Sequence, residues 1–384
     1  MCTSLTYRDA QGSVYFGRTL ELNVELPYVL AYVPEGQEFR SQVPGSRPVE
    51  YTAARAFFVI ATPDEPPAPG QPLDPMRLMA VDGVNTAGLT FSLLAYPSAG
   101  ATTLAPNCPS ALQAKDLGSW VLGQFAAAPE VADALKAQPV FRTRLGVVGG
   151  AEFPFHMAVH DRNGANIIIE WQDGEQRVYN DPVGVMTNGP EFGWHLTNLG
   201  NWTHLNNVDR SSARFGSLPV SQPDAGIATA SLPSSNTSVG RFVRAVYYTA
   251  FAQVATGADE AMLTLSRIMN NFDRPRGITT EPPSSDGDSL TFEGSGGPEK
   301  GEPSTEYTSF TVLTDLARGL FLVRTYSAFN YTKFDLNRAR PADRPRLLAL
   351  AQLDPLGGDG MDLLLGERAA SEPWEGGLVA KANP

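Results

Sequence analysis

Cysteine is scarce in this chain: only Cys2 and Cys108 occur among its 384 residues. Two cysteines can form at most one bridge, which excludes a fold that depends on a disulfide scaffold. No signal-peptide pattern stands at the start of the sequence. Together these observations predict reduced thiols and a cytoplasmic location.

Long apolar runs and blocks of positive charge are also missing. No stretch of 18 or more apolar residues occurs, so we expect no membrane span. The formal net charge is −12, and lysine and arginine do not cluster. Because binding to phosphates needs a basic surface, we expect no nucleic-acid partner.

Histidine, a common metal ligand, occurs only four times. His156 and His160 are four residues apart and flank a strand-like segment. On a strand such residues share a face but lie about 13 Å from each other, too far to bind one metal ion. The sequence therefore predicts no metal site, and nothing in it indicates a cofactor.

One of the two cysteines directly follows the initiator methionine. Removal of Met1 would place a thiol and a free α-amino group on the same residue, Cys2. An α-amino group titrates at about 7.7–8.0, against about 10.4 for a lysine, so near neutral pH it can accept a proton. A nucleophile activated by its own terminal amine needs no histidine base. The alternative is a small second residue without a catalytic role.

The first 18 residues predict a β-hairpin. Residues 2–7 and 13–18 alternate as strands do, and residues 8–12 have the composition of a turn. In that register Arg18 lies directly opposite Cys2. A guanidinium beside the thiol would lower the pKa of the thiol and favour the thiolate.

The remaining chain alternates between groups of strands and groups of helices. Strands are expected over 28–33, 56–61, 77–81, 89–95, 153–160, 166–171, 183–187, 307–316, 319–326 and 331–336. Helices are expected over 109–138, as a pair broken near Pro129, and over 192–198, 240–254, 259–271 and 347–353. This order predicts an α+β fold with largely antiparallel sheets and helices packed outside them.

Three segments do not fit regular elements. Residues 62–75 form a proline-rich loop, and residues 281–304 are poor in apolar side chains and read as a surface insertion. Residues 199–240 form a polar connection that is too long for a passive loop.

Five short motifs follow one another in the order of a known family. They are Met1-Cys2-Thr3, Phe16-Gly17-Arg18, the run from Asp82 to Leu89 (DGVNTAGL), the run from Met186 to Pro190 (MTNGP) followed by Trp194-His195, and the run from Gly240 to Arg244 (GRFVR). From residue 2 to about residue 336 the chain resembles the choloylglycine hydrolase family. This family contains bile salt hydrolases and penicillin V acylases, which are N-terminal-nucleophile amide hydrolases.

The resemblance implies a four-layer αββα sandwich with the terminal cysteine on a central strand between two antiparallel sheets. It implies a single domain over residues 2–340, followed by a C-terminal extension over 341–384. Segment 199–240 matches in position a segment that reaches a neighbouring subunit in relatives. The resemblance therefore implies a homo-oligomer, either a tetramer or a dimer.

The resemblance also assigns roles to individual residues. Cys2 matches the family nucleophile, whose amine shuttles a proton to the leaving group. Arg18 matches the arginine beside the thiol, and Arg241 matches a second active-site arginine. Asn188 matches the asparagine whose side chain donates to the oxyanion, a contact worth roughly 2.7–4 kcal/mol of transition-state stabilisation.

Two positions depart from the family pattern. The family usually has an aspartate three residues after the first arginine, where it accepts a hydrogen bond from the amine of the nucleophile; here Glu21 stands with one more methylene. The second oxyanion donor is an asparagine in typical bile salt hydrolases and a tyrosine in typical penicillin V acylases. Ala95 occupies that position here. A backbone N–H would serve equally well from alanine, but the position does not distinguish the two activities.

The sequence therefore predicts hydrolysis of a linear amide by Cys2, with release of an apolar acid and a small amine. The acyl group is expected in an apolar pocket near residues 28–33 and 56–61. Alternatives are an acyl-homoserine lactone acylase of the same fold and a non-catalytic binder of amphipathic acids. An acyltransferase that matures by internal cleavage is disfavoured, because no internal Gly-Cys pair occurs.

Overall fold

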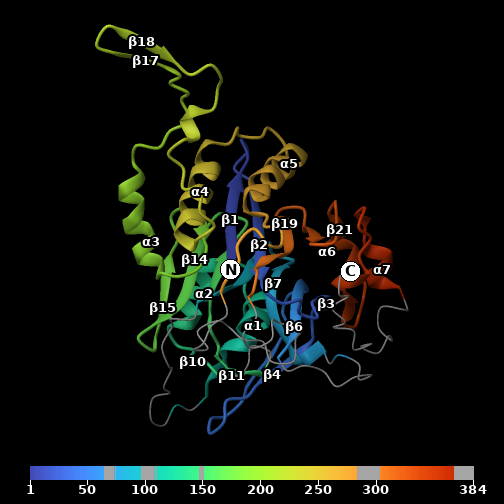
Figure 1. Cartoon of the computed structure of the whole chain (residues 1–384). Helices are drawn as coiled ribbons and strands as arrows, with labels where there is room; N and C mark the ends of the chain where they lie inside the picture. Colours follow the sequence, from blue (N-terminus) through green and yellow to red (C-terminus); the bar gives the residue numbers. More distant parts are fainter. Residues whose placement is uncertain are drawn as a thin grey trace.

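Two stacked β-sheets form the centre of the molecule (Figure 1). The computed structural model describes residues 1–64, 73, 75–96, 108, 110–146, 151–282 and 303–366. Strands such as β2 (Val14–Leu22) and β6 (Phe57–Pro63) are buried along nearly their whole length. Burial on both faces requires a covering layer on each side of each sheet.

The first sheet has the strand order β16-β1-β2-β19-β20-β21-β23 and is antiparallel except at β23. Besides β2, its strands are β1 (Cys2–Arg8), β16 (Val185–Met186), β19 (Tyr307–Asp315), β20 (Leu320–Thr325), β21 (Thr332–Asp335) and β23 (Gly358–Asp359). The strand that begins with Cys2 is therefore an inner strand, between β16 and β2.

The second sheet has the strand order β15-β14-β13-β8-β7-β6-β3-β22 and is antiparallel. Besides β6, its strands are β3 (Val29–Val33), β7 (Leu78–Asn85), β8 (Thr90–Ala95), β13 (Phe155–His160), β14 (Asn166–Gln172), β15 (Glu175–Asn180) and β22 (Arg346–Ala349). Strands β1 and β2 contact β8, so the two sheets meet where Cys2 lies.

Helices cover the outer face of each sheet. Helices α4 (Ser238–Phe251) and α5 (Ala258–Met269) pack on β1, β2 and β19, and helices α1 (Leu117–Gln124) and α2 (Ala128–Leu135) pack on β7, β8 and β14. This arrangement is the expected αββα sandwich. Pro129 separates α1 from α2 as expected, and it lies in the first turn of α2, where a missing N–H costs nothing.

Smaller elements decorate this frame. They are the strand pairs β4 (Glu38–Ser41) with β5 (Val49–Thr52), β9 (Leu112–Gln113) with β10 (Val140–Phe141) and β11 (Arg144–Leu145) with β12 (Ala151–Glu152), and the helices α3 (Phe192–Asn198), α6 (Leu336–Ala339) and α7 (Met361–Leu365). In the described part of the chain, no helix is both long enough and apolar enough to cross a membrane.

The β1–β2 hairpin forms, but the predicted register is wrong. Arg18 pairs with Ser4, not with Cys2, and the turn over residues 9–13 comes one residue later than expected. Asp9 sets this turn, because its carboxylate accepts two backbone hydrogen bonds from within it. The error shifts the pairing by two residues. Since side chains alternate with a period of two, Arg18 still faces the same side as Cys2.

Two other expected elements differ from the structure. The helix expected over 347–353 is wrong, because Arg346–Ala349 forms β22 on the open edge of β3, where backbone pairing overrides local propensity. The strand expected over 77–81 extends to Asn85 as β7. Gly83 permits this extension, because a Cβ there would lie 2.5 Å from the carbonyl oxygen of Phe58.

The long connection after residue 199 contains an arm that projects away from the two sheets (Figure 1). Its hairpin consists of β17 (Ser212–Phe215) and β18 (Leu218–Ser221), and every residue of both strands is exposed. Most of the expected insertion at 281–304 and of the proline-rich loop at 62–75 lies outside the described residues. The segment assigned to the C-terminal extension contributes β22 to one sheet and β23 to the other.

His160 should make the stability of the fold depend on pH. Its ring packs against Phe16 across the two sheets at 5.2 Å, and burial lowers the pKa of His160 to about 4. The unfolded chain binds a proton near pH 6.5, so below that pH protonation favours unfolding. This group should remove about 2 kcal/mol of stability between pH 7 and pH 5. Urea unfolding at both pH values measures this loss, and the free energy of unfolding of His160→Gln should fall by about 2 kcal/mol less than that of the parent chain.

His204→Gln, at an exposed site, is the control and should show the pH dependence of the parent chain. If His160→Gln also keeps the pH dependence of the parent chain, the assignment to His160 is contradicted.

Candidate functional site

The thiol of Cys2 lies between the two sheets beside a buried arginine. Cys2 is 3% exposed and Arg18 is fully buried. The Nη2 atom of Arg18 lies 3.6 Å from Cys2 Sγ and donates a 2.7 Å hydrogen bond to the carbonyl oxygen of Leu93 on β8. The guanidinium also stands over the ring of Phe310 at 5.1 Å. The cation expected beside the thiol is therefore present, despite the shifted register.

A carboxylate from the opposite sheet approaches the other side of the same arginine. Asp82 Oδ2 on β7 lies 3.8 Å from Arg18 Nε and accepts a 2.7 Å hydrogen bond from the hydroxyl of Ser92. Burial raises the pKa of Asp82 to about 7, against the opposing effects of Arg18 and Ser92. Sequence reasoning quoted Asp82 as part of a motif but gave it no role. Nothing in the local pattern indicates that β7 and β2, in different sheets, bring these residues together.

The side chain of Asn188 holds the backbone nitrogen of Cys2. Its Oδ1 atom accepts a 2.9 Å hydrogen bond from Cys2 N and a 2.7 Å hydrogen bond from Arg241 Nη2. Its Nδ2 atom donates a 2.8 Å hydrogen bond to the carbonyl oxygen of Ala95. Because Oδ1 and Nδ2 both have hydrogen-bond partners, these contacts fix the side-chain amide of Asn188 with its oxygen toward Cys2 N.

Arg241 connects the first turn of α4 to β1. Its Nη1 atom donates to Thr3 Oγ1 at 2.9 Å and to the carbonyl oxygen of Cys2. The helix start is fixed by the Thr237 hydroxyl, which accepts from the backbone of Gly240. A Cβ at Gly240 would lie 2.6 Å from the Ser235 hydroxyl, so glycine permits the close packing that aims Arg241 at β1.

Glu21 lies on the helix-covered face of the first sheet. Its Oε1 atom accepts a 3.2 Å hydrogen bond from Thr308 Oγ1, and burial raises the pKa of Glu21 against the opposing charge of Arg241. With Met1 in place, the N–H of Cys2 donates to Asn188, as described above. The implied hydrogen bond between Glu21 and a freed amine stays a prediction.

Ala95 contributes its backbone to the site. Its carbonyl oxygen accepts from Asn188, and the next residue, Tyr96, donates its N–H to Pro154 at 2.6 Å. The structure therefore brings Ala95 beside Asn188. The donation of its own N–H to an oxyanion stays a prediction.

Two buried histidines hold the segment that carries Asn188. The Nε2 atom of His156 lies 3.2 Å from the carbonyl oxygen of Thr187, and that of His195 lies 2.9 Å from the carbonyl oxygen of Asn188. Because a carbonyl only accepts, both ring nitrogens donate. Burial lowers the pKa of His195, so the ring is neutral at pH 7. Sequence reasoning weighed His156 only as a metal ligand and quoted His195 only as part of a motif, so it missed this role.

Glu170 lies between these histidines and the start of α3. It is fully buried, accepts from the backbone N–H of Phe192 at 3.2 Å and lies 3.6 Å from His156 Nδ1. His195 stacks on Phe242 of α4 at 4.5 Å, and His156 stacks on Tyr96 at 4.8 Å. These contacts anchor the turn that presents Asn188.

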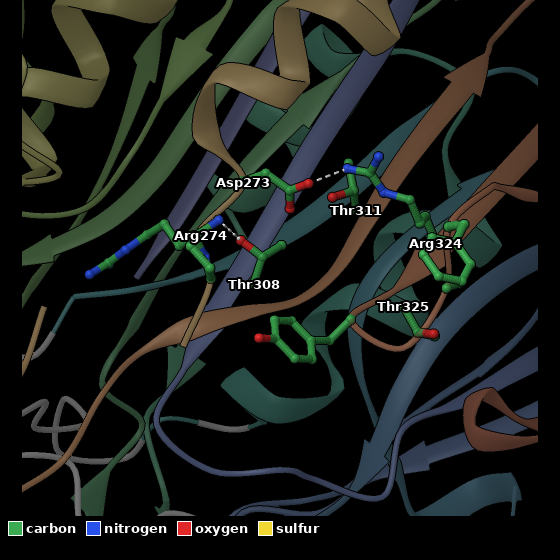
Figure 2. Close-up of a pocket in the computed structure, with 10 residues that line it drawn as sticks. Asp273, Arg274, Thr308, Thr311, Arg324 and Thr325 are labelled. Carbon is green, nitrogen blue, oxygen red and sulfur yellow. Dashed lines mark hydrogen bonds and ion pairs between the residues drawn. The ribbon is translucent and has the colours of Figure 1, made fainter. Parts of the chain in front are cut away.

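A pocket of about 310 Å³ lies on the other side of the first sheet (Figure 2). Thr308 and Thr311 of β19 line it, and an ion pair between Arg324 and Asp273 borders it. Thr311 pairs with Thr19, the neighbour of Arg18, and successive side chains on a strand point to opposite faces. The pocket is therefore separated from the thiol by the sheet itself. Among the described residues, no group of three or more histidine, cysteine or acidic side chains is placed to hold a metal ion.

His195→Ala should destabilise the protein. The variant leaves the buried carbonyl of Asn188 without its donor, which costs about 1–3 kcal/mol. His195→Gln retains an N–H donor and should recover part of the loss, while His204→Ala, at an exposed position, should change little. Urea unfolding at pH 7 measures the three variants. Equal stabilities of His195→Ala and the parent chain would show that the contact does not hold the turn.

Comparisons with known proteins find a matching family model, related sequences and similar folds. The model of the linear amide C–N hydrolases, choloylglycine hydrolase family, matches residues 2–342. Conjugated bile acid hydrolase of Lactobacillus acidophilus is 30% identical over 256 residues, which cover 64% of this chain and 74% of that protein. A mutant of conjugated bile acid hydrolase from Clostridium perfringens has a similar structure, with a TM-score of 0.73, 20% identity and coverage of 91% of this chain and 96% of that one. Penicillin V acylase from Agrobacterium tumefaciens gives a TM-score of 0.72 at 19% identity, covering 97% and 98% of the two chains.

Proposed function

Because the chain belongs to the choloylglycine hydrolase family of linear amide C–N hydrolases, we propose that Cys2 is the nucleophile of an amide hydrolase. The reaction releases an apolar carboxylic acid and a small amine, as in bile salt hydrolases and penicillin V acylases. The observation that carries the proposal is the convergence of Arg18, Asn188 and Arg241 on one residue, Cys2.

The first step is attack on the substrate carbonyl by the thiolate of Cys2. Arg18 stabilises this thiolate, because its Nη2 atom lies 3.6 Å from Sγ and both residues are buried. The attack forms a C–S bond and moves the carbonyl electrons onto oxygen. The Nδ2 atom of Asn188 carries two hydrogens, and only one is used by Ala95, so the other can donate to this oxyanion. The N–H of Ala95 is the proposed second donor.

The proton transfers need the free amine of Cys2. We propose that Met1 is removed, which converts the Cys2 nitrogen from an amide into a base. The amine takes the thiol proton and gives it to the nitrogen of the leaving group as the C–N bond breaks. It then takes a proton from water as the hydroxide attacks the thioester carbonyl. The C–S bond breaks, the acid leaves, and Cys2 is restored as a thiolate with the proton on its amine. Asn188 Oδ1 lies 2.9 Å from this nitrogen and orients the amine. Glu21 is proposed to accept a hydrogen bond from the amine when the amine is protonated.

The acyl group is proposed to lie in the apolar region where Tyr28 meets Phe310. These rings pack edge to face at 5.1 Å, next to the guanidinium of Arg18. The expected segments 28–33 and 56–61 form the neighbouring buried strands β3 and β6, in agreement with the strands predicted there. Parallel assays with glycocholate, penicillin V and an acyl-homoserine lactone would identify the preferred acyl group and the leaving amine.

Cys2→Ala should abolish turnover of whichever amide the parent enzyme hydrolyses, because the variant has no thiol at the site to form the thioester. Cys2→Ser should retain a small fraction of the activity, since an alcohol is a weaker nucleophile at neutral pH. Cys108→Ala is the matched control and should retain full activity. Mass spectrometry of the N-terminal peptide checks that Met1 is absent. Full turnover by Cys2→Ala, or by a chain that retains Met1, would refute the mechanism.

We also propose that the protein is cytoplasmic and assembles as a homo-oligomer, a tetramer or a dimer. Both cysteines are free thiols, which supports a reducing compartment, and cell fractionation tests the location. The projecting arm within segment 199–240, which carries the hairpin β17–β18, supports assembly. Phe215 and Leu218 in its hairpin are 71% and 60% exposed, which is costly unless another surface covers them.

Charges on the arm should lower the oligomeric state. Phe215→Asp combined with Leu218→Asp would place carboxylates where an apolar contact is proposed, so the molar mass in light scattering should fall toward that of one chain. Ser217→Asp adds a charge in the same hairpin at an exposed polar position and should leave the mass unchanged. An equal mass for all variants would show that the arm does not mediate assembly.

A further inference from the structure

Between the sheets, the buried guanidinium of Arg18 lies beside two acidic groups, the thiol of Cys2 and the carboxyl of Asp82. Arg18 lies with Nη2 3.6 Å from Cys2 Sγ and with Nε 3.8 Å from Asp82 Oδ2. Cys2 is 3% exposed, and the other two residues are fully buried. No second arginine or lysine pairs with Asp82 among the described contacts.

Apart from Arg18, few groups around Asp82 stabilise its ionised carboxylate. Ser92, its register partner on β8, donates one hydrogen bond to Oδ2. The other oxygen, Oδ1, has no hydrogen-bond partner among the described residues. On β6 the neighbouring residue is the apolar Ile60. The negative charge on Asp82 therefore depends on Arg18.

Two other ionisable side chains near the thiol, Arg241 and Tyr28, do not compete for Arg18. Arg241, from α4, is held by Asn188 and by the backbone of Cys2, and its charge acts on Glu21. Tyr28, which precedes β3, is neutral because burial raises its pKa. Arg18 is thus the cation that the thiolate and Asp82 share.

We propose that Asp82 is a positioning residue that competes with the Cys2 thiolate for the charge of Arg18. Two anions beside one buried cation would leave an unbalanced negative charge in a site of low dielectric, whereas one anion leaves the cluster neutral. An ionised Cys2 Sγ therefore favours the protonated form of Asp82, and an ionised Asp82 favours the protonated thiol. The coupling deepens the proposed function, since it sets the pH at which the nucleophile becomes available.

The protonation of Asp82 supports this coupling. Burial raises the pKa of Asp82 to about 7, so near neutral pH the carboxyl is divided between its two forms. A small change in how strongly Arg18 interacts with either acid then changes the protonation of both Asp82 and Cys2. A carboxyl fixed in one form would not respond in this way.

The test is the pH profile of alkylation of Cys2 by iodoacetamide, followed by the mass of the N-terminal peptide so that Cys108 does not interfere. Asp82→Asn removes the competing anion and should lower the midpoint of the profile by on the order of one pH unit. An unchanged midpoint would overturn the coupling. A raised midpoint would also overturn it, because it would mean that Asp82 serves only to hold Arg18 beside the thiol.

Ser92→Ala provides an independent variant if Asp82→Asn does not fold. Without the hydroxyl, the Asp82 anion is less stable, so the midpoint should move in the same direction by a smaller amount. Asp181→Asn is the matched control: burial also raises the pKa of Asp181 to about 7, but its partners are the backbone of Val183 and Gly184. Its midpoint should equal that of the parent chain, and an equal shift in this control would overturn the proposal.

Alkylation reports the thiol without any amide turnover, so the two proposals can fail separately. A lowered midpoint in a protein that hydrolyses no amide supports the coupling and refutes the proposed function. Amide hydrolysis with an unchanged midpoint refutes the coupling and leaves the function standing.

Discussion

The burial of the charge of Arg18 between two β-sheets is the constraint on which the site depends. A guanidinium in a closed interior must be hydrogen-bonded or paired, because an uncompensated buried charge costs several kcal/mol. Here the compensation comes from both sheets: Leu93 and Asp82 from one, and Cys2 from the other. The arrangement of the sheets that covers Arg18 also sets the thiol beside it. Stability and reactivity therefore follow from the same contacts.

A second set of contacts fixes the backbone of Cys2 from the α4 side of the first sheet. Asn188 and Arg241 bond each other and the residue between them, and the turn that bears Asn188 is held in turn by His156 and His195. The side chain of Cys2 thus faces the second sheet while its backbone is held from elsewhere. Because these contacts hold the backbone and not Sγ, the thiol remains available for reaction, while the nitrogen of Cys2 stays directed at Asn188.

Much of the fold was predictable because its signals are local. Hairpin turns, the proline in the first turn of α2 and the alternating strands all depend on neighbours within a few residues. The register of the β1–β2 hairpin was wrong by two residues, since the hydrogen bonds of Asp9 decide where the turn begins. Residues 346–349 were misassigned for a different reason: the edge of β3, more than 300 positions earlier in the sequence, supplies the pairing.

The sequence by itself determined the family and the α+β class, and it supplied the candidate site residues, because motif order and residue type are properties of the chain. It named Cys2, Arg18, Asn188 and Arg241 without any knowledge of their distances. Only the tertiary structure decided that Asp82 shares Arg18 with the thiol and that two buried histidines support the segment that carries Asn188. Such pairings depend on which strands of two different sheets meet, and this is settled by packing over the whole core.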